Sequence, residues 1–97
     1  METGSFSEKK IIPNPSVVFT DLEDGNAVLL DLDSKFYYSL NGTGCFMWKI
    51  FESNGTVDVK KVVVNLVDEY EVEEAQAVRD VEDFVSTLAK EGLINLS

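Results

Sequence analysis

The chain has 97 residues, of which 44% are hydrophobic and 27% are charged, which fits one small globular domain and excludes wholesale disorder. Eighteen acidic residues against eight basic ones give a formal net charge of -10, which disfavours binding to nucleic-acid phosphates or anionic membranes. The chain has no histidine and one cysteine, Cys45, so it lacks Ser-His and Cys-His dyads, an internal disulfide and a thiolate metal cluster.

The N-terminal residues 1–12 are expected to form a mobile tail, because the first ten are polar and aperiodic. The tail has no apolar run of signal-peptide length, and no stretch of the sequence approaches the ~18 apolar residues of a membrane span. We therefore expect a cytoplasmic protein with one folded domain over residues 13–97. Pro13 and Pro15 fix φ and remove two hydrogen-bond donors, so the domain is expected to begin with an extended segment.

Three short segments with a strand-like composition come next, at residues 16–22, 27–32 and 35–40. The residues between them are typical of tight turns, and Gly25 can supply the positive φ that a hairpin requires. Short turns join neighbouring antiparallel strands, so the segments are predicted to form an antiparallel meander.

The third of these strands contains three consecutive aromatic residues. Alternation places Phe36, Tyr38 and Leu40 on one face of the strand and Tyr37 and Ser39 on the other. If the strands lie in chain order, this strand forms a sheet edge. An edge offers unpaired N–H and C=O groups, to which an extended peptide can add as a further strand.

The first of three predicted helices follows Asn41, a good N-cap residue, and ends at Gly55. It is apolar nearly all round, so we expect other elements to wrap it or one stripe of it to face a partner. The second helix is expected to be capped by Thr56 and to extend to about Tyr70, although residues 62–64 also fit a strand.

The third helix is predicted from about Glu74 to Glu91, with Gly92 as its C-terminal cap. Its apolar residues recur at helical spacing. Residues 93–96 are short and apolar, and they fit either a final strand or a tail packed on the core.

The sequence offers no strong candidate for a catalytic group. Most carboxylates fall in predicted turns and on polar helix faces, where solvated charges are the ordinary interpretation. Cys45 has no histidine to activate it, so a packed thiol is favoured over a nucleophile. Gly42 and Gly44 do not complete a phosphate-binding fingerprint, and no calcium-loop pattern is present. The sequence predicts a protein that is not an enzyme and has no metal or other cofactor.

Several short motifs in the chain occur in a distinctive order. The most specific of them join the third strand to the first helix through Leu40, Asn41, Gly44 and Trp48. The others are residues 27–32, 36–41, 78–84 and 92–94, together with Leu88. In order and spacing, these motifs resemble the PqqD-like family, small proteins named for coenzyme PQQ synthesis protein D. The resemblance covers nearly the whole chain, from Pro13 to Leu96.

This resemblance implies an α+β, winged-helix-like domain in which a three-stranded antiparallel meander is followed by three helices. It also implies a non-catalytic accessory protein. Such a domain would bind the leader of a ribosomally synthesised precursor peptide in a groove between the third strand and the third helix. It would present that peptide to a modifying enzyme, typically a radical SAM enzyme.

The peptide-binding residues that the resemblance implies lie on these two elements. They are Phe36, Tyr37, Tyr38, Ser39 and Leu40 on the strand, and Val78, Asp80, Val81, Glu82 and Val85 on the helix. The sequence does not decide which flank of the helix faces the strand. The alternative is a winged-helix DNA-binding or protein-interaction module, but residues 57–97 carry ten acidic and four basic residues, which argues against groove insertion.

Overall fold

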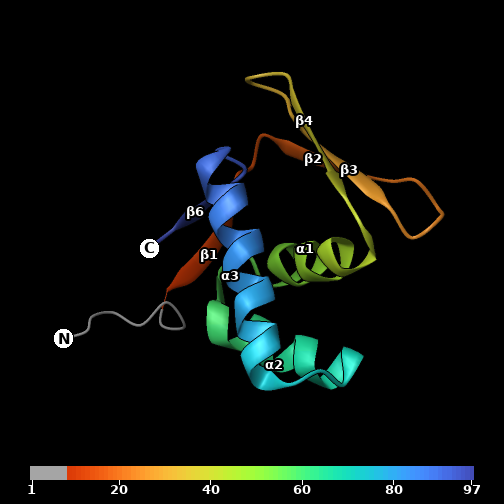
Figure 1. Cartoon of the computed structure of the whole chain (residues 1–97). Coiled ribbons are helices and arrows are strands. Elements are labelled where there is room, and N and C mark those ends of the chain that lie inside the picture. The colour runs from red at the N-terminus through yellow and green to blue at the C-terminus, as the bar shows by residue number, and fades with distance from the viewer. Residues whose placement is uncertain (1–8) are drawn as a thin grey trace.

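The computed structural model describes residues 9–97, so the tail expected over residues 1–8 lies outside the described residues. Figure 1 shows its strands and helices in chain order. They are β1 (Lys10–Pro13), β2 (Val17–Asp21), β3 (Ala27–Asp31), β4 (Phe36–Leu40), α1 (Gly42–Asn54), β5 (Val57–Asp58), α2 (Val59–Tyr70), α3 (Glu74–Lys90) and β6 (Ile94–Leu96). The predicted α+β class, with a meander before three helices, is confirmed.

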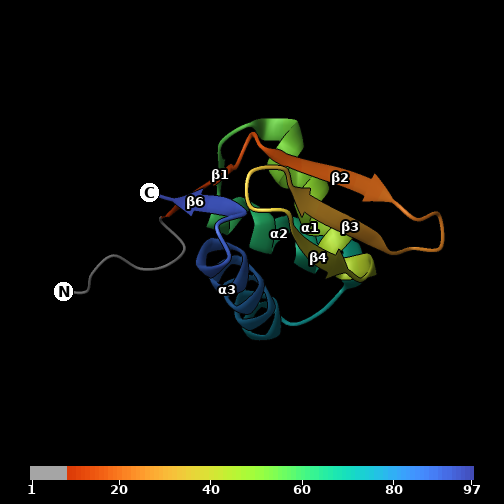
Figure 2. The same cartoon turned by 90° about the horizontal axis from the view of Figure 1, so that it is seen from above.

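The meander forms an antiparallel sheet in the order β2-β3-β4. Leu29 at its centre lies opposite Phe19 on β2 and Tyr38 on β4, and it is fully buried. The predicted alternation along β4 is confirmed, since Tyr37 is 68% exposed on the outer face while Leu40 is buried on the inner one. Seen from above, β4 is the strand of this sheet that lies nearest α3 (Figure 2).

A second small sheet, in the order β5-β1-β6, was not predicted. Its central strand β1 begins at Lys10, inside the segment expected to belong to the tail. Ile11 pairs with Val57 and Leu96 and is completely buried, so the folded unit includes residues before Pro13. These pairings join the two ends of the chain to its middle, and such long-range contacts leave no local pattern in the sequence.

The hydrophobic core lies where α1 packs against the other elements. Trp48 and Phe51 of α1 are fully buried, as is Leu66 of α2. Of the two arrangements expected for α1, the structure shows its apolar side packed within the core, while residues such as Lys49 and Glu52 remain exposed. Figure 1 shows α1 between the β2-β3-β4 sheet and α2. Over residues 9–97, no helix has both the length and the apolar character needed to cross a membrane.

Helix boundaries follow local chemistry at some ends and tertiary pairing at others. Asn41 caps α1 as predicted, because its Oδ1 accepts the Gly44 N–H at 2.8 Å. The prediction that Thr56 caps the second helix is wrong. Val57 and Asp58 pair with β1 instead, so α2 begins at Val59 with no side-chain cap.

Candidate functional site

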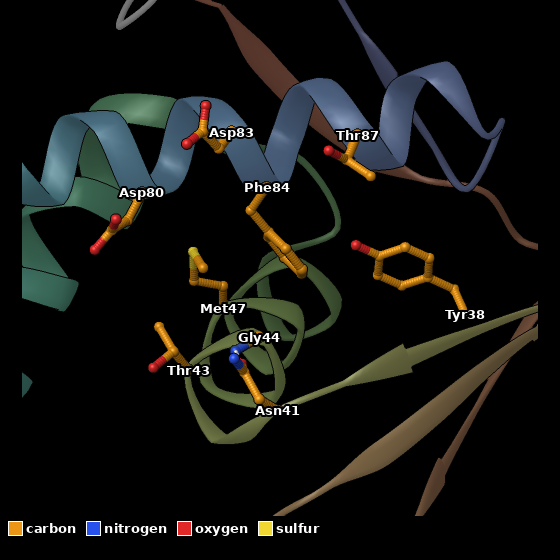
Figure 3. A pocket seen from close by; sticks show the side chains of 9 residues that line it. All are labelled: Tyr38, Asn41, Thr43, Gly44, Met47, Asp80, Asp83, Phe84 and Thr87. Atoms are coloured by element: carbon orange, nitrogen blue, oxygen red, sulfur yellow. Dashed lines mark hydrogen bonds between the residues drawn. The ribbon is translucent and has the colours of Figure 1, made fainter.

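A hollow of about 360 Å³ lies between the end of β4, the first turn of α1 and one side of α3. Figure 3 shows its lining side chains. They are Tyr38, Asn41, Thr43, Gly44, Met47, Asp80, Asp83, Phe84 and Thr87. Tyr38 of β4 and Met47 of α1 lie on either side of Phe84 (Figure 3), which extends from α3 together with Asp80, Asp83 and Thr87.

The hollow lies beside an open strand edge. In the described part of the chain β4 pairs with β3 alone, and its other edge has no strand partner. Alternate residues of an edge strand direct their N–H and C=O groups outward, where an added strand can bind them. The edge and the hollow together form a groove bounded by backbone on one side and α3 on the other, which we call the β4–α3 groove.

The floor of the groove is apolar, and a glycine allows its close packing. Phe84 extends from α3 towards Met47 and α1 (Figure 3). A Cβ atom on Gly44 would lie 3.3 Å from Phe84 Cε1 and 3.2 Å from Leu40 Cδ2, closer than an ordinary van der Waals contact. Glycine at this position therefore lets α3 approach the start of α1.

The α3 wall of the groove is acidic. Asp80 is half-buried and its Oδ1 accepts a hydrogen bond from Gln76 Nε2 at 2.8 Å, whereas Asp83 is exposed at the rim. The nine lining residues include no lysine or arginine. The groove therefore combines a strand edge, an aromatic and aliphatic floor, and negative charge along one wall.

The sequence matches the family of coenzyme PQQ synthesis protein D (PqqD) over residues 26–94. The chain belongs to the PqqD family. The match includes β3, β4 and all three helices, and so it contains every residue that lines the β4–α3 groove.

Two solved structures resemble this PqqD family member. TbiB1 in complex with the TbiA(beta) leader peptide is 27% identical, with a TM-score of 0.78 over 87% of this chain and 94% of that one. A lasso peptide synthetase B1 complexed with the leader peptide is 28% identical, with a TM-score of 0.73 over 88% of this chain and 96% of that one. No curated protein matches the sequence.

On β4, the structure separates the residues that were predicted to contact a peptide. Tyr38 lines the hollow, and Phe36 lies half-buried on the same face of the strand. Tyr37 and Ser39 point to the opposite, exposed face, so their side chains lie away from the hollow. Leu40 is buried in the core. Backbone from all five residues still contributes to the strand that borders the groove.

On α3, only one of the five predicted residues lines the hollow, namely Asp80. Val81 and Val85 have exposed fractions of 0% and pack in the core, so the structure corrects their placement towards the groove. Val78 and Glu82 are half-buried and do not line the hollow.

Sequence reasoning missed the flank of α3 that faces β4. The core stripe of α3 is Ala77, Val81, Val85 and Leu88. The groove stripe is Asp80, Asp83, Phe84 and Thr87. Both stripes follow the spacing of a helix face, but only the first is uniformly apolar. The sequence feature that indicated the groove stripe is Phe84, a large apolar residue that lies among acidic ones.

Cys45 lies outside this groove. Burial, together with the nearby Asp21 carboxylate, raises the pKa of its thiol, and its Sγ donates a weak hydrogen bond to the Gly25 carbonyl at 3.7 Å. The thiol is therefore protonated at neutral pH, which makes it a poor nucleophile. Within residues 9–97, no three His, Cys, Asp or Glu side chains are grouped closely enough to hold a metal ion.

Proposed function

We propose that this chain is a non-catalytic accessory protein that binds the leader of a ribosomally synthesised precursor peptide and presents it to a modifying enzyme. The observation that carries the proposal is the open edge of β4 facing α3 across an apolar-floored hollow. The two similar structures, both complexes with leader peptides, support it. Membership of the PqqD family favours a radical SAM enzyme as the partner.

In the proposed complex, the leader adds to β4 as a further strand. Main-chain hydrogen bonds to β4 supply affinity without reading sequence, and alternate side chains of the guest supply specificity. Guest side chains on the inner face of the sheet enter the hollow beside Tyr38 and Phe84. Those on the outer face share the exposed surface that bears Tyr37.

The charge distribution favours a peptide over DNA as the occupant. A DNA-binding winged helix inserts a helix into the major groove and contacts phosphates with cations. Here the accessible side of α3 presents Asp80 and Asp83. A strand edge in the same place recognises a peptide backbone, which carries no net charge.

The proposal is tested by selecting binders from a displayed library of random decapeptides and titrating an enriched peptide into isotope-labelled protein. We expect amide shifts in β4 and in the groove stripe of α3. Neighbouring tyrosines provide a matched pair of variants. Tyr38→Ala removes a lining side chain and should weaken binding about tenfold or more, as loss of a buried aromatic anchor does. Tyr37→Ala removes an outer-face side chain and should have little effect on affinity.

Peptide-induced shifts confined to other surfaces, or equal losses for the two tyrosine variants, would refute the groove assignment. A titration with duplex DNA at low salt tests the alternative. Binding that falls steeply with added salt would favour the DNA-binding module.

A further inference from the structure

We infer that the β4–α3 groove selects a leader strand carrying lysine or arginine two residues from an apolar anchor, with both side chains facing α3. This inference rests on the proposed function and adds the chemistry of the preferred peptide. The hollow and the strand edge define the site, and its two carboxylates define which side chain is preferred there.

The spacing of the groove stripe matches that of an extended guest. Asp80 and Phe84 are four residues apart on α3, which is about 6 Å along a helix axis. Side chains on one face of a strand recur every two residues, or about 6.6 Å. Tyr38 and Asp80 lie on opposite sides of Phe84 in Figure 3. An apolar guest side chain between Tyr38 and Phe84 therefore places its next same-face neighbour near Asp80.

The carboxylates of the groove have no cationic partner in the described structure. Over residues 9–97, the one salt bridge joins Lys10 of β1 to Asp58 of β5, and neither residue lines the hollow. Arg79 is next to Asp80 in sequence, but it donates a hydrogen bond to Gln76 Oε1 at 3.3 Å instead. Gln76 Nε2 binds Asp80 Oδ1 and so orients the carboxylate without neutralising it.

The first turn of α1 also lines the hollow, and its helix dipole favours an anion. That dipole amounts to about half a positive charge. One of its N–H groups, that of Gly44, already donates to Asn41 Oδ1. Two full negative charges, on Asp80 and Asp83, outweigh it. A guest cation near Asp80 is therefore favoured, and an acidic guest residue at the same position is repelled.

The expected preference is moderate because both carboxylates contact solvent. The expected gain in affinity lies between that of an exposed ion pair and that of a charge-assisted hydrogen bond. A peptide with lysine at this position should therefore bind about 3–10 times more tightly than the same peptide with glutamine. At an ionic strength of 1 M the Debye length is about 3 Å, so the preference for a basic residue should shrink at high salt.

The experiment repeats the decapeptide selection with the wild-type chain and with an Asp80→Asn, Asp83→Asn double variant. Asparagine retains an Oδ1 acceptor for Gln76 and removes only the charge. A control double variant, Asp68→Asn with Glu69→Gln, removes the same charge from exposed positions on α2. The wild type and the control should both enrich lysine or arginine two residues from an apolar anchor. Peptides selected on the Asp80→Asn, Asp83→Asn variant should share the apolar anchor but show no preference for a basic residue beside it.

A reversed variant, Asp80→Lys with Asp83→Lys, should instead enrich aspartate or glutamate at that position. Groove-binding peptides that show no basic preference in the wild type would overturn this inference and leave the proposed function intact. An equal loss of the preference in the control variant would also overturn it, because the effect would then follow net charge. Selected peptides that bind outside the β4–α3 groove would overturn the proposed function as well.

Discussion

Replacing Val85 by alanine tests which side of α3 faces the core. The Val85 side chain is completely buried in the core stripe of α3, the helix that packs against α2 and β6. Truncation removes two methyl groups at about 0.8 kcal/mol each and leaves a small cavity, so the free energy of unfolding should fall by about 2 kcal/mol. For a domain of this size, that corresponds to a decrease in Tm of about 8–16 °C.

The measurement is urea unfolding followed by the fluorescence of Trp48, the single tryptophan, which is itself buried. The midpoint should fall by about 1 M with an unchanged slope, since m is about 1–3 kcal/mol/M for small proteins. Below the transition, affinity for a groove-binding peptide should match that of the wild type. If Val85→Ala lowered the free energy of unfolding by less than about 0.5 kcal/mol and also weakened peptide binding, Val85 would face the groove. The orientation of α3 described above would then be wrong.

Three further predictions concern the cap of α1, the first strand and the cysteine. Asn41→Ala removes the acceptor for the Gly44 N–H and should cost about 1 kcal/mol in urea unfolding, whereas Asn41→Asp should restore most of that loss. Ile11→Ala should cost about 2–5 kcal/mol, because Ile11 is fully buried in β1; a negligible loss would place residue 11 in a tail as the sequence suggested. Cys45 should react with iodoacetamide more slowly than free cysteine at pH 8, because burial raises the pKa of its thiol, and its rate should still rise above pH 9; a plateau by pH 8 would contradict this.

The sequence alone determined the features that depend on neighbouring residues. Alternation along residues 36–40 separated the inner and outer faces of β4, and Asn41 marked the start of α1. These signals are readable because a strand has a period of two and because an N-cap bonds N–H groups in the first turn that follows it. The resemblance to the PqqD-like family likewise depends on short runs of residues.

Tertiary structure decided the features that depend on distant partners. The pairing of Ile11 with Val57 and Leu96 creates a sheet from three segments that are too short to predict separately, and it shifts the start of α2 to Val59. The orientation of α3 is the second case. Val81 and Asp80 are adjacent, but Val81 is buried in the core, whereas Asp80 lines the hollow that β4 and the first turns of α1 form with α3. A helical pattern gives the width of an apolar stripe, but the elements that pack beside it determine which polar flank becomes a binding wall.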